Sequence, residues 1–269
     1  MFTKVNFGSW LPFGGSKTQE AAVTTNTTMI TLNLSGVNAE IVPEDRANIQ
    51  TELKGTGNVT VQQRGDNITV TYHRKWYEWL SFFNRTKLTI YIPQSYQHNM
   101  ELAIGSGNLD FIGQTSNSVK LDHLSVILGS GNLHLKNLVV NHLDDRCASG
   151  NNNIERIKTK DGSFEVSSGN VIVKHFQGPL KTRLSSGNFK AQLDQLKNPV
   201  DVEVSSGNVQ LDLPQDADFT LNGKISSGII SSDFPLKNEK RDSHTLQGTH
   251  GSGKYDVNLS VSSGRIKVN

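Results

Sequence analysis

The chain has 269 residues, a hydrophobic fraction of 35%, 24 glycines, 7 prolines and a formal net charge of only +2. This length corresponds to one or two domains, and the apolar content supports a narrow core, which excludes general disorder. The small net charge gives no global attraction to nucleic acid. The single cysteine, Cys147, excludes an intramolecular disulfide and a cysteine-based metal framework.

Residues 1–27 predict a flexible N-terminal lead, because glycines, serines and threonines separate isolated aromatic residues. This lead lacks the continuous apolar region of a secretory signal, and no segment of the chain reaches the roughly 20 apolar residues that cross a bilayer. We therefore expect a protein that is cytoplasmic or peripheral to the membrane. The alternative is the cell surface, reached by an unrecognised export route.

Residues 28–99 predict a β-rich N-terminal portion. Polar and apolar residues alternate over 29–34, 58–63, 67–72 and 87–92, the pattern of half-buried strands. Arg64-Gly65-Asp66 joins the second and third of these segments as a hairpin turn.

An aromatic and basic segment interrupts this portion between His73 and Lys87. Trp76, Trp79, Leu80 and Phe83 fall at i, i+3, i+4 and i+7, the spacing of one helical face. Aromatic side chains with basic neighbours suit a membrane interface or a protein partner, whereas the structural alternative is a cap over the open end of the core. The candidate contact residues are Arg74, Lys75, Trp76, Tyr77, Trp79, Leu80, Phe82 and Phe83.

From about residue 100 a short motif recurs six times, in which a small residue and a serine precede Gly-Asn. The steps between its glycines are 24, 19, 19, 18 and 20 residues. A recurring turn flanked by alternating strands indicates stacked coils of about 20 residues. The predicted fold is therefore all-β, a single-stranded β-helix or β-solenoid over 100–269, continuous with 28–99 and capped by the aromatic segment.

The repeated Gly-Asn pairs predict a structural turn ladder. Glycine permits a positive φ or a close approach of backbones, and stacked asparagines can hydrogen-bond amide to amide. The ladder residues are Gly107, Asn108, Gly131, Asn132, Gly150, Asn151, Gly169, Asn170, Gly187, Asn188, Gly207 and Asn208.

The C-terminal copies depart from the motif, as expected where a solenoid ends. Ile229, Lys254 and Arg265 stand where the earlier copies have asparagine. The polar segment 235–250 predicts a loop. The last strand, 264–269, predicts an exposed edge that can pair with another chain, although Arg265 and Lys267 oppose such pairing.

Two further residue clusters resemble functional sites, but a structural role is favoured for both. Residues 248–254 imitate a phosphate-binding loop but lack the following Ser or Thr and the helix, so a degenerate repeat turn is favoured over nucleotide binding. His142, Asp144, Asp145 and Cys147 fall in one connection, where a solvated corner is favoured over a metal site. We expect neither a cofactor nor a metal.

Asp122, Asp145 and Asp201 lie 14, 13 and 13 residues after a ladder asparagine. Their alignment on one face would support a carbohydrate-active enzyme, the alternative function. They lack adjacent partner carboxylates, however, and acid–base pairs must lie within about 5–10 Å, so a non-enzymatic role is favoured.

The Ser-Gly-Asn units on short strands resemble an adhesin family of bacterial β-solenoid domains of unknown function, related to auto-transporter adhesin head domains. The resemblance covers about 29–269 and implies no catalytic residue. It implies a non-catalytic binding scaffold or sensor at the cell envelope, with a role in envelope stress, that contacts a protein partner or a membrane surface. Carbohydrate is a further candidate ligand, and a self-assembling structural protein with edge-to-edge pairing is a further alternative.

Overall fold

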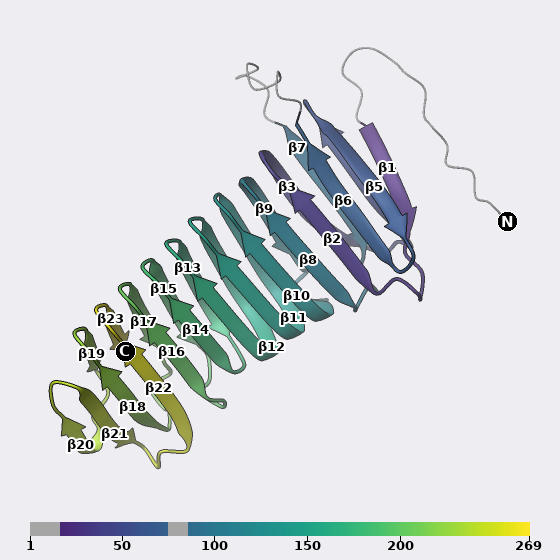
Figure 1. Ribbon diagram of the computed structural model, residues 1–269. Coiled ribbons are helices and arrows are strands. Elements are labelled where there is room, and N and C mark those ends of the chain that lie inside the picture. Colours follow the sequence, from purple (N-terminus) through teal and green to yellow (C-terminus); the bar gives the residue numbers. More distant parts are fainter. Residues whose placement is uncertain (1–16, 75–85) are drawn as a thin grey trace.

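The computed structural model describes residues 17–74 and 86–269, which form 23 strands and no helix. The strands stack into an elongated solenoid whose coils follow one another along a single axis (Figure 1). The N-terminal strands are β1 (Lys17–Ala22), β2 (Met29–Leu34), β3 (Val37–Glu44), β4 (Asn48–Lys54), β5 (Asn58–Arg64), β6 (Asn67–His73) and β7 (Lys87–Pro93). The all-β solenoid expected from the repeats is confirmed.

The central strands are β8 (Asn99–Ile104), β9 (Gly107–Ile112), β10 (Val119–Leu128), β11 (Asn132–Cys147), β12 (Asn151–Val166), β13 (Asn170–Phe176), β14 (Leu180–Leu184), β15 (Asn188–Leu193), β16 (Val200–Val204) and β17 (Asn208–Asp212). The C-terminal strands are β18 (Phe219–Ile225), β19 (Ile229–Ser232), β20 (Lys237–Arg241), β21 (Thr245–His250), β22 (Tyr255–Val261) and β23 (Arg265–Val268).

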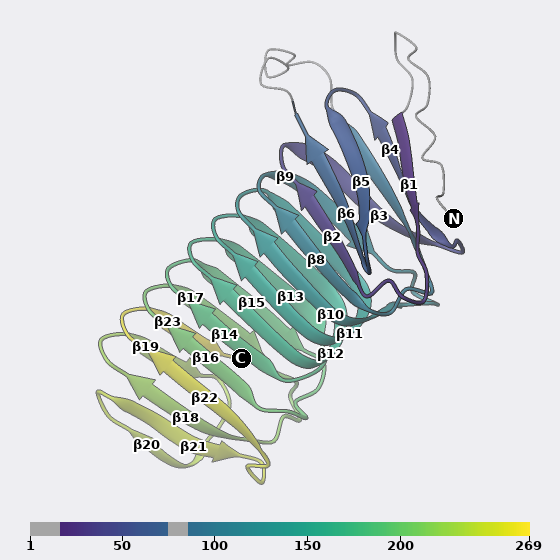
Figure 2. The same ribbon diagram turned by 45° about the vertical axis from the view of Figure 1, so that its right-hand side comes forward.

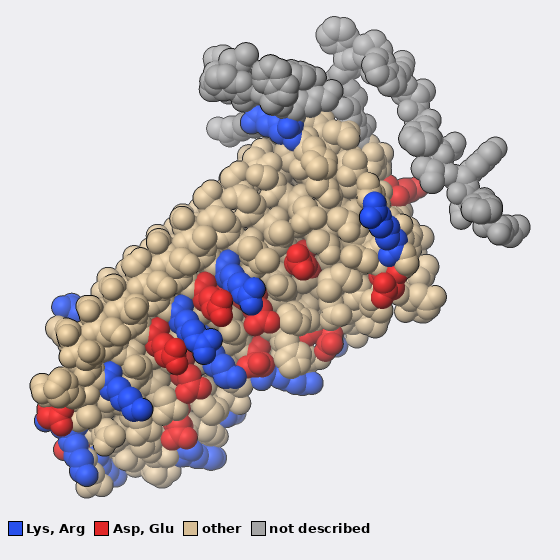
Figure 3. All heavy atoms as spheres, in the orientation of Figure 1, with Lys and Arg blue, Asp and Glu red and all other residues tan. Residues whose placement is uncertain are grey.

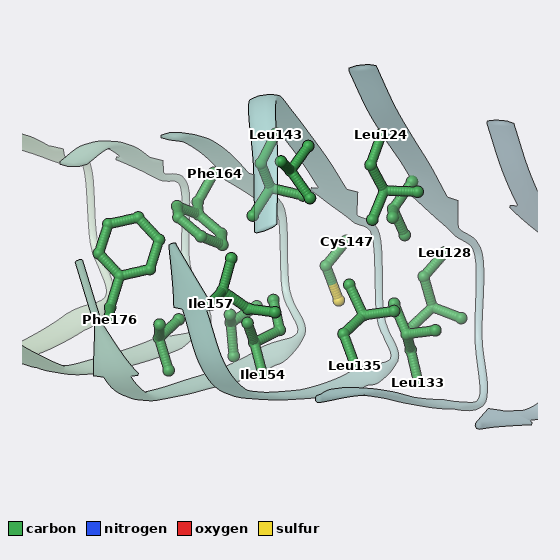
Figure 4. Packing of buried hydrophobic residues seen from close by; sticks show 14 of the residues in the cluster. Leu124, Leu128, Leu133, Leu135, Leu143, Cys147, Ile154, Ile157, Phe164 and Phe176 are labelled. Carbon is green, nitrogen blue, oxygen red and sulfur yellow. The ribbon is translucent and has the colours of Figure 1, made fainter. Parts of the chain in front are cut away.

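Each central coil contributes one strand before and one strand after its Ser-Gly-Asn turn. The strands before the turns pair in parallel, as in β14 with β16, and so do the strands after the turns, as in β15 with β17. Because side chains alternate along a strand, every second residue points inward. Leucine, isoleucine, valine and phenylalanine fill the interior in layers that continue from coil to coil (Figure 4).

The turn glycines allow the coils to approach closely at this corner. Gly131 has a φ of +132°, and a Cβ there would overlap the carbonyl oxygen of Gly107 in the preceding coil. One coil later, a Cβ on Gly150 would lie 2.8 Å from the carbonyl oxygen of Gly131, which also accepts a hydrogen bond from Asn151 N at 2.8 Å. Glycine is therefore required by both backbone conformation and space.

A second corner is built without glycine. Asn137, Arg156 and His175 have φ values of 57°, 54° and 55° and occupy equivalent positions in successive coils. β11 and β12 continue through this corner as 16-residue strands. Asparagine and histidine are enriched in this conformation and arginine is not, so the three positions share no residue type that would reveal the corner in the sequence.

The C-terminal end of the stack is interleaved. β18 and β19 follow β17 in the chain, yet β22 and β23 lie between them and the preceding coil. We call residues 255–268, which comprise β22 and β23, the terminal coil. The chain thus leaves one coil position empty, forms β18 and β19, and returns to fill the gap (Figure 2).

The N-terminal end has the same arrangement in reverse. β2 lies between β6 and β8, and β3 lies between β7 and β9. The outermost layer is antiparallel, with β4 paired to β7 and β1 paired to β4. β1 falls within the segment expected as a flexible lead, so residues 17–22 of that lead form a strand.

Two C-terminal expectations are wrong. Residues 235–250 do not loop out but contain the hairpin β20–β21, whose strand β21 pairs antiparallel with β18. Leu246 is fully buried beside Gly223, and Phe234 packs edge-on against Phe219 at a 5.3 Å centroid distance, so this hairpin covers the end of the core. Strand 264–269 is not an exposed edge either, because β23 is paired with both β17 and β19.

Candidate functional site

The six predicted ladder asparagines lie in register along one corner of the solenoid. Each amide nitrogen donates to the side-chain oxygen of the preceding rung, at 2.6 Å from Asn132 to Asn108 and 3.0 Å from Asn151 to Asn132. Asn38 adds a rung that sequence reasoning missed, since it accepts from Asn108 at 2.7 Å. Beyond the rungs, Lys87 is in register with Asn38 and Arg265 with Asn208.

The turns and this ladder form a strip that we call the turn edge. It consists of residues 105–108, 129–132, 148–151, 167–170, 185–188 and 205–208, and none of these 24 positions is charged. The edge is the uncharged border along the upper side of the molecule in Figure 3. The asparagines and most of the serines are exposed, so the edge presents amides and hydroxyls at the spacing of the coils, about 4.8 Å.

A charged face adjoins the turn edge on the strands that precede the turns. Arg146, Glu165, Arg183 and Glu203 follow one another in register, with Arg146 Nε 3.3 Å from Glu165 Oε2 and Arg183 Nε 3.2 Å from Glu203 Oε2. Figure 3 shows the resulting alternation of positive and negative residues. Each charge faces its opposite in the next coil, so the face has no single-sign patch to attract a charged polymer.

The aromatic segment begins where the turn edge approaches the N-terminal end. Between the register pairs Asn33–Thr71 and Asn38–Lys87, the β2–β3 connection has four residues (34–37), whereas the β6–β7 connection has fifteen (72–86). The segment is therefore a long insertion at the position of a tight turn. Arg74 is exposed; Lys75, Trp76, Tyr77, Trp79, Leu80, Phe82 and Phe83 lie outside the described residues, as does the cap expected there.

An apolar hollow of about 410 Å³ lies beside the start of this insertion. It is formed on the outer surface of neighbouring strands, with Thr71 and Tyr72 on β6, Ala103 on β8 and Ile127 on β10. Ile127 is 43% exposed, and the small residues Ala103 and Gly105 leave the depression next to it. Sequence reasoning did not find this hollow, because it depends on which outward residues become neighbours when the coils stack.

The carboxylates considered for catalysis do not share a face. Asp122 is exposed, Asp201 is half-buried on the outer surface, and Asp145 points into the core with 1% of its surface exposed. Asp122 accepts from Asn141 at 2.8 Å and Asp201 from Asn258 at 2.8 Å, so both serve as rungs of small polar ladders. The alignment that the enzyme alternative would need does not occur, because strand alternation turns Asp145 to the opposite side.

Asp145 and Asn152 form a polar pair inside the apolar stack. Nδ2 of Asn152 lies 2.6 and 2.7 Å from the two carboxyl oxygens of Asp145, while Oδ1 of Asn152 is buried with no hydrogen-bond partner among the described residues. Burial raises the pKa of Asp145 to about 7. A protonated Asp145 supplies an O–H that Oδ1 can accept after a small amide rotation, so the neutral pair satisfies both groups.

The same alternation separates the four residues considered for a metal. Asp145 and Cys147 face the core, whereas His142 and Asp144 face outward, where His123 Nε2 lies 2.9 Å from Asp144 Oδ2. Burial, followed by the charge of Asp145, raises the pKa of the Cys147 thiol to about 11, which makes it a poor nucleophile. Across residues 17–74 and 86–269, no three His, Cys, Asp or Glu side chains are placed to hold a metal ion.

The loop that imitates a phosphate-binding motif is filled by the protein itself. Asp218 Oδ1 accepts hydrogen bonds from the backbone nitrogens of Ser252, Gly253 and Lys254 at 2.7, 2.6 and 3.1 Å, and Oδ2 accepts from Ser252 Oγ at 2.6 Å. The Ser252 hydroxyl and these N–H groups lower the pKa of Asp218. The interpretation of 251–253 as a degenerate repeat turn is wrong, since the loop joins β21 to β22 across the start of β18.

These features define an all-β repeat scaffold in which the polar side chains described above hydrogen-bond or pair with one another. The chain belongs to the Toastrack family of domains of unknown function, DUF4097, whose model matches residues 27–269. The adhesin-type resemblance is thereby supported at the level of a domain of unknown function, and the relation to auto-transporter head domains stays a prediction. No protein with a curated description matches the chain.

The chain is similar to several solved structures at low identity. A putative adhesin from Parabacteroides merdae is 10% identical, with a TM-score of 0.46 and coverage of 94% of this chain and 96% of that one. A putative adhesin from Parabacteroides distasonis is 14% identical, with a TM-score of 0.44 and coverage of 95% and 98%. A putative lipid binding protein from the same species is 13% identical, with a TM-score of 0.41 and coverage of 94% and 96%. These values are too low to transfer any ligand.

Within the described ranges, no helix is long and apolar enough to cross a membrane.

Proposed function

We propose that this protein is a non-catalytic binding scaffold of the bacterial cell envelope, and that residues 74–83 are its contact surface for a membrane or a protein. The observation that carries this proposal is the fifteen-residue connection between β6 and β7 at a position where the neighbouring coil needs only four residues. An insertion at a loop on a rigid scaffold is the usual place for binding residues.

The composition of the insertion supports an interfacial contact. Residues 74–85 combine three basic residues, Arg74, Lys75 and Arg85, with two tryptophans, one tyrosine and two phenylalanines, against a single acidic residue, Glu78. Tryptophan and tyrosine favour the membrane–water interface, and basic residues are attracted to anionic lipid. The adjoining apolar hollow beside Thr71 and Tyr72 extends the apolar surface at the same end of the molecule.

The interior and the turn edge support a scaffold rather than a reaction site. The candidate phosphate, metal and catalytic sites each contain a residue that already makes a structural contact. Asp218 fills the phosphate-like loop, Asp144 of the candidate metal cluster pairs with His123, and the candidate catalytic residue Asp145 pairs with Asn152. A sensor role in envelope stress belongs to this proposal, with ligand contact at the insertion as the input. The proposed localisation is cytoplasmic or peripheral to the membrane, and the alternative is the cell surface, reached by an unrecognised export route.

Vesicle co-sedimentation tests the contact surface. The wild type should sediment with anionic phosphatidylglycerol vesicles and less with phosphatidylcholine vesicles. The Trp76→Ala/Trp79→Ala variant should bind about tenfold or more weakly, since a buried aromatic side chain contributes about 1.5–3 kcal/mol. Ile112→Ala/Ile172→Ala is the matched control, because these side chains are 42% and 40% exposed on other coils. Equal binding by the wild type and the tryptophan variant would refute the membrane contact.

If the ligand is a protein rather than a membrane, we expect a different result with the same wild type and variants. Cross-linking in envelope extracts should then give a defined adduct with the wild type and with the isoleucine control, and none with the tryptophan variant. If the wild type neither sedimented with vesicles nor formed a cross-linked adduct, the assignment of residues 74–83 as the contact surface would be overturned.

A further inference from the structure

The terminal coil occupies a position that the rest of the chain leaves prepared for it. β22 pairs with β16 on one side and β18 on the other, and β23 pairs with β17 and β19. Its inward side chains, Val257, Leu259, Val261, Ile266 and Val268, are at most 2% exposed. Without this coil, two pairs of strand edges would face each other across a gap of one coil.

A comparison with the outer coil, residues 219–232, shows why the terminal coil fits this gap. Residues 219–232 align with 255–268 position by position, and both contain a Ser-Ser-Gly corner. The inward position of Leu259, however, is Gly223 in the outer coil, where Leu246 of the hairpin packs. The outer coil therefore fits the end position of the stack, whereas the terminal coil fits the internal position next to it.

One loop connects the terminal coil to the rest of the molecule. Residues 251–254 lead from β21, on one side of β18, to β22 on the other side. Gly251 and Gly253 have φ values of 68° and 79°. The loop is clasped by Asp218, which accepts three backbone N–H groups and one hydroxyl from it. One carboxylate thus holds the hinge of the terminal coil.

We propose that the terminal coil exchanges between two copies of this chain, and that Asp218 is the clasp that restrains the exchange. A second copy is the partner that fits, because its own residues 255–268 make every contact of the gap by construction. Exchange of an identical element conserves all of these contacts, so only the hinge and the opening step oppose it. This inference is independent of the proposed contact surface at residues 74–83.

Disulfide trapping with full-length chains detects the exchange. Asn222 and Asn258 are register partners on β18 and β22, and Asn222 Nδ2 donates to Asn258 Oδ1 at 3.1 Å. A chain with Asn222→Cys is mixed with a chain with Asn258→Cys, and both also carry Asp218→Asn. After oxidation, exchange should give a heterodisulfide, since the two introduced thiols meet only when one chain's coil fills the other's gap. Cys147 is buried and does not compete.

Three controls fix the interpretation. The double variant Asn222→Cys/Asn258→Cys should close within one chain, which proves that the geometry permits the bond. Asp110→Cys mixed with His134→Cys, register partners in the central coils, should give no heterodisulfide, because those coils do not exchange. Asp216→Asn, which removes the same charge two residues away, replaces Asp218→Asn in a further arm.

The Asp218→Asn background should give about tenfold more heterodisulfide than the Asp216→Asn background, because weakening one charge-assisted set of hydrogen bonds changes a population by about that factor. Equal yields in the two backgrounds would overturn the role of Asp218. A yield no higher than that of the Asp110/His134 control, with the intrachain bond formed normally, would overturn the exchange itself.

Discussion

The central coils and the two ends solve the same packing problem in different ways. In the centre, each coil follows its predecessor in space as in the chain, and the Ser-Gly-Asn corner repeats with one glycine and one asparagine per coil. At both ends the chain order is broken, because a coil is inserted one position inside the outermost coil. Regular stacking thus extends the solenoid, whereas interleaving gives the coils near each chain end neighbours on both sides, which opposes local unfolding.

The largest expected effect comes from adding one methyl group at the Ser-Gly-Asn corner of a central coil. We expect Gly131→Ala to destabilise the fold by about 3–5 kcal/mol, because the added Cβ meets the carbonyl oxygen of Gly107 and the φ is positive. Denaturant unfolding followed by circular dichroism measures this loss. Gly36→Ala is the control: its φ is +72° but no atom lies within 4 Å of the added group, so it should lose only about 1–2 kcal/mol. Equal losses would show that space at the corner is unimportant.

The buried pair of Asp145 and Asn152 makes the stability of the central coils depend on pH. Because burial raises the pKa of Asp145 to about 7, the stabilisation by its proton is complete below about pH 4 and is lost as the pH rises through 7. We expect the unfolding free energy to fall by about 2–4 kcal/mol between pH 4 and pH 8 from this group. Unfolding curves of the wild type and Asp145→Asn, measured at both pH values, separate its share, since the variant should lack that part of the slope.

Hydrogen exchange compares the interleaved end with an ordinary strand edge. Amides of the terminal coil should exchange at least about tenfold more slowly than those of β20, although both lie in the last 33 residues of the chain. β22 and β23 have partners on both sides, whereas β20 is exposed along its whole length and pairs with β21. Mass spectrometry of peptides covering 237–241 and 255–268 decides this. Rapid exchange over 255–268 would mean that the coil is not held between its neighbours.

The smallest effect concerns the ladder. Asn151→Ala removes one hydrogen bond to Asn132 and one from Asn170 on an exposed edge, so we expect a loss of about 1 kcal/mol in unfolding free energy. Asn153→Ala is the control, because it is an exposed asparagine of the same strand that lies outside the ladder. Indistinguishable unfolding midpoints for the two variants would show that the ladder contributes nothing measurable.

The regular part of the molecule could be predicted because its signal is repeated. The strands expected at 29–34, 58–63, 67–72 and 87–92 agree with β2, β5, β6 and β7 to within a residue. Asn38 escaped notice because a valine separates it from its glycine. The corner at Asn137, Arg156 and His175 escaped notice because no residue type repeats there and arginine rarely adopts positive φ.

The interleaved ends were not predictable for a different reason. Coils 219–232 and 255–268 carry the same alternation and the same Ser-Ser-Gly corner, so each satisfies the local requirements of either position. What decides between the positions is the hairpin: Leu246 needs the space at Gly223, and this contact between distant segments has no local pattern. The inward turn of Asp145 is similar, since an aspartate in an alternating strand is normally assigned to the surface.

The interleaving also determines how the molecule bears mechanical load. A force applied through Asn269 reaches β23, which is bonded on both sides, and Asn269 itself exchanges backbone hydrogen bonds with Leu211 and Leu213 at 2.8 and 2.9 Å. Pulling along this strand must shear two ladders at once, whereas an outermost coil would peel from one edge, one bond at a time. The stack therefore resists extension from its C-terminal side at the strand where a simple solenoid would unravel first.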